Sequence, residues 1–268
     1  IILPVLPNKV YGPPPFDVLN PLKIWLLVVF ISGIGFVGYV LMKVVGAQRG
    51  IGITGLLGGI VSSTAVTLSL TQKSKEAAPL GQSFAMAILV AWTVMFIRVL
   101  GIVAVVNFAL LPSIGLVIGA PALAGAGYAA FLFFGKRHSP PAHEIHLDNP
   151  FRLGPAIKFG LLFTLILIVA KVAQVYLGTT GIYLSSFVSG LVDVDAIVIS
   201  VARFSSDSSS LSLNAAAWSV AIASVANTIL KGTFVIMGGE SSLRRAILPG
   251  FILILVSCIA AAAWGVSR

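Results

Sequence analysis

The sequence predicts an all-α membrane protein of about eight transmembrane helices, arranged as two repeats of four helices. Of its 268 residues, 58% are hydrophobic and only 9% are charged, and the mean hydropathy is +1.06. Soluble domains carry about 25% charged residues. The apolar residues form runs of about 20 residues, the length that crosses a bilayer. A further observation is that landmarks of the first half recur in the second half, about 130 residues later.

Eight apolar runs are separated by short polar or Pro- and Gly-containing connectors. The expected helices cover residues 22–45, 51–71, 83–108, 113–134, 155–177, 181–202, 213–237 and 246–265. The net charge of +9 lies mainly in Lys and Arg between these runs, where membrane proteins carry cytoplasmic charge. It therefore does not require a nucleic-acid partner. The single cysteine, Cys258, allows no internal disulfide and no cysteine metal cluster.

The chain divides into four parts. Residues 1–20 resemble the tail of a preceding segment followed by a loop, and the start at Ile1 indicates a piece of a longer protein. Residues 21–135 form the first repeat, 136–150 a polar linker and 151–268 the second repeat. Asn149-Pro150 echoes Asn20-Pro21 at the start of each repeat. These shared landmarks favour an internal duplication.

The basic loops also predict an orientation. If all eight helices cross the membrane, one side collects Lys9, Lys23, Lys73, Lys75, Lys136, Arg137, Arg152, Lys158, Arg203 and Arg268. The other side collects Lys43, Arg49, Arg244 and Arg245. The bias places both termini of this multi-pass protein in the cytoplasm. If the second and sixth helices are broken or re-entrant instead, each repeat has three full spans and the halves become inverted.

An intramembrane carboxylate pair marks the candidate site. Asp193 and Asp195 lie within the apolar run Ser189–Arg203, where each carboxylate costs roughly 2.5–3.5 kcal/mol on insertion scales. On a continuous helix the two side chains point about 200° apart. We therefore expect a break near Ser189-Gly190 that lets them converge on a hard cation such as Mg²⁺. The alternative is that each Asp pairs with Lys171 or Lys231 and only holds helices together.

Hydroxyl groups occupy the corresponding place in the first half. When Gly59 is aligned with Gly190, Ser62 and Thr64 fall on the two aspartates. Ser62, Ser63 and Thr64 are expected to supply neutral oxygens to the site, and a break is expected near Gly58-Gly59. Close helix packing by small residues is the competing explanation.

Three bases lie at apparent mid-membrane depth: Arg98, Lys171 and Lys231. They are expected to act as counter-charges or gating groups that neutralise the aspartates when no ion is bound. Binding of an anionic substrate and snorkelling to the interface are the other interpretations. Asn227 lies one helical turn before Lys231 and is expected to supply a further neutral oxygen.

The function predicted from these groups is passive or ion-coupled transport of a divalent cation. The lipid bilayer and a small inorganic ion are the expected partners, and a homodimer or a partner membrane domain is left open. No nucleotide-binding motif and no nucleophile–base arrangement is found, so an enzyme is not expected. No cofactor is expected beyond a bound divalent cation such as Mg²⁺. A non-transporting regulatory or scaffolding subunit is the alternative, and an anion carrier is the third option.

Several stretches resemble the MgtC/SapB-like membrane proteins: residues 3–13, 19–25, 56–67, 190–196 and 226–231. The similarity is to the C-terminal membrane domain of unknown function of the long members, and it covers nearly the whole chain. The resemblance implies a bacterial or archaeal inner-membrane protein that lacks its MgtC-type N-terminal domain here. The family name implies a link to magnesium homeostasis, although that link belongs to the absent domain.

Overall fold

The computed structural model describes residues 47–135, 182–206 and 211–265, together with isolated positions before residue 47. The elements in this part of the chain are all helical, which confirms the predicted all-α class. They are α2 (Ala47–Glu76), α3 (Gly81–Val106), α4 (Leu111–Phe134), α6 (Ile182–Val192), α7 (Val194–Phe204), α8 (Leu213–Gly238) and α9 (Ser241–Gly265), with the 3₁₀ turns η2 (Ala78–Leu80) and η3 (Phe108–Leu110).

Five helices in the described ranges are long and apolar enough to cross a membrane: Gly50–Glu76, Ala78–Val106, Phe108–Phe134, Leu213–Gly238 and Ser241–Trp264. The chain therefore has the helices of a membrane protein. The expected helix at 155–177 lies outside the described residues, as does the linker at 136–150, and only scattered positions of the helix at 22–45 are described. The count of eight helices is accordingly not established.

The core lies along α3 and α8, which run through the middle of the bundle and contact most of the other helices. Phe84, Trp92 and Phe96 of α3 are fully buried, and the Trp92 ring meets the edge of Phe251 at 6.0 Å between centroids. Large apolar side chains such as Phe134 instead point outward. An apolar surface around a packed core is what a lipid environment permits.

The first part of α2 runs parallel to α3. A Cβ added at Gly55 would lie 2.8 Å from Ala87 Cα, and one added at Gly59 would lie 2.8 Å from Ala91 Cα. Later positions along α2 therefore contact later positions along α3, so the two helices run in the same direction. Because the two glycines are four residues apart, they share one helix face and let the two backbones approach closely.

The second part of α2 runs in the opposite direction. The Trp92 indole N–H donates to Thr67 Oγ1 at 2.8 Å, and the chain then returns to the start of α3 through η2. Between the two parts lies Ser62, whose extended backbone (φ −162°, ψ 106°) interrupts the helix. Although α2 is long enough to span a membrane, it reverses at Ser62 and forms a helical hairpin, which we name the first hairpin.

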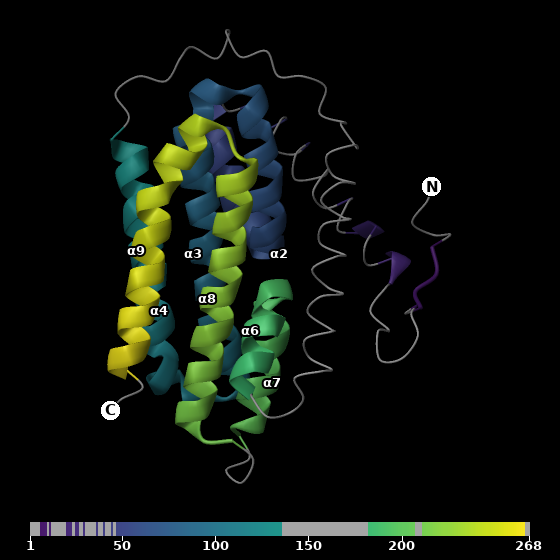
Figure 1. Cartoon of the computed structure of the whole chain (residues 1–268), viewed down its shortest axis with the longest axis vertical. Coiled ribbons are helices and arrows are strands. Elements are labelled where there is room, and N and C mark those ends of the chain that lie inside the picture. Colours follow the sequence, from purple (N-terminus) through teal and green to yellow (C-terminus); the bar gives the residue numbers. More distant parts are fainter. Residues whose placement is uncertain are drawn as a thin grey trace.

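A second hairpin is formed by α6 and α7, which are separated by Asp193. Gly190 packs against Ala223 of α8, where an added Cβ would lie 2.6 Å from the Ala223 Cα. The α7 helix then runs alongside α3 towards Asn107, whose side-chain amide donates to the Ala202 carbonyl at 3.3 Å. In Figure 1 both α6 and α7 lie beside the lower half of α8, whereas α2 lies beside its upper half.

The two hairpins therefore enter the bundle from opposite ends, and their tips face one another near its middle (Figure 1). Breaks were expected near Gly58-Gly59 and Ser189-Gly190. The structure places them three residues further along, at Ser62 and at Asp193. The glycines remain inside regular helix because their missing Cβ is needed for packing, and the reversal takes place at the next polar residue that can cap a new helix.

Candidate functional site

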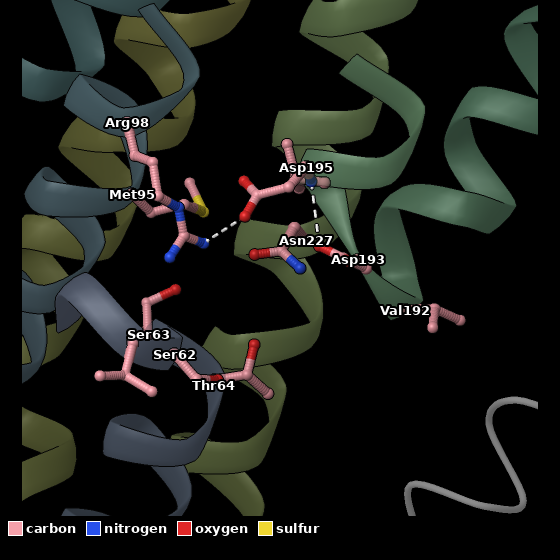
Figure 2. Close-up of a pocket in the computed structure, with 11 residues that line it drawn as sticks. Ser62, Ser63, Thr64, Met95, Arg98, Val192, Asp193, Asp195 and Asn227 are labelled. Carbon is pink, nitrogen blue, oxygen red and sulfur yellow. Dashed lines mark hydrogen bonds and ion pairs between the residues drawn. The ribbon is translucent and has the colours of Figure 1, made fainter. Parts of the chain in front are cut away.

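A pocket of about 240 Å³ lies between the two hairpin tips (Figure 2). Its lining comes from α2, α3, α6, α7 and α8 and consists of Val61, Ser62, Ser63, Thr64, Met95, Arg98, Val192, Asp193, Val194, Asp195 and Asn227. The pocket brings together all six side chains expected to bind an ion, as well as Arg98. Lys231 lies directly behind the wall, and Lys171 lies outside the described residues.

Each tip is capped by its own polar side chain. Ser62 Oγ accepts from the Ala65 backbone N–H at 3.2 Å, and Asp193 Oδ1 accepts from the Asp195 backbone N–H at 2.9 Å. A side-chain oxygen at this position satisfies an N–H group that the start of a helix leaves unpaired. The same residues that end one helix therefore start the next, which explains why the chain reverses there.

Arg98 of α3 contacts both hairpins. Its Nη2 lies 2.8 Å from Asp195 Oδ2, and its Nη1 donates to the Ile60 carbonyl at 2.8 Å. The Ile60 carbonyl precedes the break at Ser62, so the guanidinium satisfies a group near the end of the first half of α2. Pairing of the aspartates with Lys171 or Lys231 was the alternative expected from sequence. The structure gives Asp195 a different partner, Arg98, because the second hairpin delivers its tip to α3.

Asn227 of α8 binds a backbone carbonyl of the second hairpin just before its break, as Arg98 does in the first hairpin. Its side-chain amide donates to the Gly190 carbonyl at 2.9 Å, three residues before the break at Asp193. Asn227 was expected to offer an oxygen to an ion. Its nitrogen fixes the hairpin tip, and the residue also lines the pocket, so its role as an oxygen ligand stays a prediction.

Lys231 is fully buried. Its Nζ donates to Ser63 Oγ at 3.2 Å and to Met95 Sδ at 2.9 Å, and it lies 5.6 Å from the centre of the Trp92 ring. No carboxylate of the described residues forms an ion pair with it. Lys231 therefore contacts the tip of the first hairpin through a hydroxyl group, as Arg98 contacts the tip of the second through a carboxylate.

The site contains equal numbers of acids and bases. Asp193 and Asp195 face Arg98, with Lys231 behind them, so the four side chains in their usual charge states sum to zero. The Arg98–Asp195 pair is only partly satisfied: Arg98 Nε and Asp195 Oδ1 are enclosed and have no hydrogen-bond partner among the described residues. Both side chains are about a quarter exposed, at 29% and 26%.

Four lining residues were missed by sequence reasoning: Met95, Val61, Val192 and Val194. Met95 lies three residues before Arg98, so the helical spacing alone places it on the same face of α3. The three valines flank the breaks at Ser62 and Asp193 and carry no polar group that would single them out.

A dedicated metal centre is not found in the described ranges, where no cluster of three or more His, Cys, Asp or Glu side chains exists. Mg²⁺ is usually bound through one or two carboxylates together with water. Asp193 and Asp195 could supply those one or two carboxylates. However, Asp195 is already paired with Arg98, and Asp193 uses one oxygen to cap α7.

Comparison with known proteins gives the family. The model of a domain of unknown function, DUF4010, matches residues 29–239, which is more than half of the chain. The chain belongs to the DUF4010 family. The matched range contains both hairpins and every described residue that lines the pocket.

A relative of this chain is an uncharacterized protein of Aquifex aeolicus (strain VF5), which is 31% identical over 201 residues. The alignment covers 72% of this chain and 84% of the relative. No solved structure matches. The expected resemblance to the MgtC/SapB-like proteins is wrong, because DUF4010 is a different family and neither match points to MgtC/SapB.

Proposed function

We propose that this DUF4010 protein is a membrane transporter that binds its cargo in the pocket between the two hairpin tips. The observation that carries the proposal is that two helical hairpins enter from opposite ends and meet at one polar pocket. Non-helical backbone at membrane depth is tolerated where it lines a cavity, and broken helices form the binding sites of many transporters. The proposed role is non-enzymatic.

Asp193 and Asp195 are the proposed acceptors for a positive charge on the cargo. The exposed Asp193 and the partly exposed Asp195 line the pocket, so both carboxylates are reachable from it. Arg98 would act as the internal counter-charge that neutralises Asp195 when the pocket is empty. An inorganic cation such as Mg²⁺ remains a candidate cargo on these grounds, and it must displace Arg98 to reach Asp195 Oδ2.

We further propose that the halves are inverted repeats. At a shift of 131 residues, Gly59 corresponds to Gly190 and the break at Ser62 corresponds to the break at Asp193. Opposite directions of entry for the two hairpins agree with repeats of inverted topology, in which cargo sites lie at the interface between halves. Rocking of one hairpin and then the other would open the pocket to each side in turn.

The orientation that we propose differs from the one expected when every helix crosses. Ser242 Oγ donates to the Ala78 carbonyl at 2.7 Å, which joins the start of α9 to η2, directly after α2. Because α2 reverses, the basic residues of its last turn, Lys73 and Lys75, lie at the same end of the bundle as Arg244 and Arg245 of α9. We name this end the α8–α9 end. At the opposite end, Arg203 is the one basic residue in the described ranges. The positive-inside rule places the α8–α9 end in the cytoplasm and the end of α9 outside.

Accessibility of pocket positions tests transport without knowledge of the cargo. In a Cys258→Ala background, Thr64→Cys and Val61→Cys are labelled with a membrane-impermeant maleimide from each side of sealed vesicles. A transporter exposes these positions to both sides in alternation. A static scaffolding or regulatory subunit, the alternative function, would expose them to one side or to neither. Leu123→Cys, which is 76% exposed in the middle of α4, is the control for lipid-facing positions.

A further inference from the structure

The charge arrangement of the pocket constrains the cargo more narrowly than the carboxylates alone. When the pocket is empty, Arg98 and Asp195 neutralise one another. A bare cation that takes Asp195 leaves the guanidinium without its carboxylate, and a bare anion that takes Arg98 leaves the carboxylate without its guanidinium. Because both side chains are only about a quarter exposed, the loss of either partner is unfavourable. A cargo with one charge of each sign replaces both partners at once.

Two atoms of the pair that lack hydrogen-bond partners also favour a cargo with both charges. Arg98 Nε is a donor that needs an acceptor, and Asp195 Oδ1 is an acceptor that needs a donor; both lack a partner in the described part of the chain. Guanidinium groups bind carboxylates through two parallel hydrogen bonds, and an ammonium group offers three donors to carboxylate oxygens. Because both atoms are enclosed, a molecule that carries both groups would reach them only when the Arg98–Asp195 pair separates, and it would then supply the acceptor and the donor that they lack.

The volume of the pocket agrees with such a molecule. Liquid water occupies about 30 Å³ per molecule, so about 240 Å³ greatly exceeds the volume of a bare ion. Pockets for drug-sized ligands begin at about 300 Å³. The remaining walls carry hydroxyl groups of Ser62 and Thr64 and the apolar side chains of Val192 and Val194. This lining suits a compact organic solute with a small side chain.

We infer that the cargo is a small zwitterion of the amino-acid type, with its ammonium group on Asp195 and Asp193 and its carboxylate on Arg98. The inference deepens the proposed transport function and rests on it. Cargo binding would exchange the Arg98–Asp195 contact for two contacts to the cargo. Since this contact links α3 to the second hairpin, its exchange would also release that hairpin to move.

Matched analogues test the inference in the purified full chain. L-alanine carries both charges, ethylamine lacks the carboxylate and propionate lacks the ammonium group. Thermal stabilisation is titrated with each compound, and also with glycine, L-serine, Na⁺ and Mg²⁺. We expect at least one small amino acid to bind at least tenfold more tightly than ethylamine and propionate. Lys75→Gln, an exposed residue away from the pocket, is expected to leave every affinity unchanged.

Two variants test which side chain binds the carboxylate of the cargo and which binds its ammonium group. Arg98→Gln should abolish the preference for the amino acid over ethylamine, and Asp195→Asn should abolish its preference over propionate. If either variant unfolds, Thr64→Val, which removes a neutral lining hydroxyl, replaces it and should weaken amino-acid binding severalfold. Binding of Na⁺ or Mg²⁺ but of no small amino acid would overturn the zwitterion and leave the proposed transport intact. Absence of alternating accessibility at Thr64 and Val61 would overturn transport, and the inference with it.

Discussion

Arg98 and Asp195 form an ion pair of 2.8 Å between α3 and the tip of the second hairpin. The same guanidinium donates to the Ile60 carbonyl of the first hairpin. One side chain therefore links two hairpins that enter the bundle from opposite ends. Any movement that opens either tip must break a contact of Arg98.

Loss of either charge of this pair should destabilise the protein. Because both side chains are about a quarter exposed, the cost lies between those of surface and buried pairs, at about 1–3 kcal/mol. Asp195→Asn and Arg98→Met should each lower the melting temperature in detergent. The double variant should recover most of the loss, since it leaves no unpaired charge. Additive losses in the double variant would contradict a direct interaction.

Gly190 should not tolerate a side chain. A Cβ at this position would lie 2.6 Å from Ala223 Cα, and a helix backbone cannot yield as a flexible side chain can. Gly190→Ala should therefore cost about 1–3 kcal/mol of stability through overpacking. Gly119→Ala in α4 is the matched control, because nothing lies within 4 Å of the added Cβ. Alanine there is expected to be neutral or to stabilise by up to about 1 kcal/mol.

Substitutions should distinguish the two proposed roles of Asp193, which are capping of α7 and binding of cargo. Asp193→Ala removes the cap of α7 and should cost about 1 kcal/mol. Asp193→Ser restores a capping oxygen, as Ser62 provides in the first hairpin, and should retain the melting temperature of the native protein. The same variant lacks the negative charge, so it should weaken stabilisation by a cargo that carries a positively charged group. Equal cargo-dependent stabilisation in Asp193→Ser and native protein would exclude Asp193 from cargo binding.

Lys231 should be replaceable by methionine without loss of stability. Its buried Nζ has a hydroxyl, a thioether and an aromatic ring as neighbours and no carboxylate in an ion pair. Methionine fills a similar volume and removes a buried charge, which is often neutral or stabilising. Lys231→Ala should instead cost about 2–5 kcal/mol because it leaves a cavity. Comparison of the two melting temperatures shows whether the volume or the charge of Lys231 contributes to stability.

The two ends of the bundle should be labelled from opposite sides of the membrane. In the Cys258→Ala background, Lys75→Cys at the α8–α9 end should react with an impermeant maleimide only after the cells are opened. Phe108→Cys, which is 71% exposed at the opposite end, should react in intact cells. The reverse pattern would invert the proposed orientation. Labelling of both positions from one side would contradict the described path of α3.

The sequence alone determined the class of the protein and much of its helix plan. The low charge content and the long apolar runs require burial in lipid, and the expected helices at 83–108, 113–134 and 213–237 lie within two residues of α3, α4 and α8. The sequence also singled out Asp193 and Asp195, because a carboxylate in an apolar helix is costly, and the hydroxyl residues 62–64, because they occupy the corresponding place in the first half.

Tertiary structure decided how those groups meet. A break in a helix can be read from local residues, but the direction in which the chain leaves the break depends on packing of Gly55 and Gly59 against α3 and of Gly190 against α8. That direction made α2 a hairpin, gave Asp195 the partner Arg98 and left Lys231 with neutral neighbours. The Arg98–Asp195 pair joins side chains that are 97 residues apart in the sequence. Such a pair depends on the fold, because local periodicity in the sequence does not predict it.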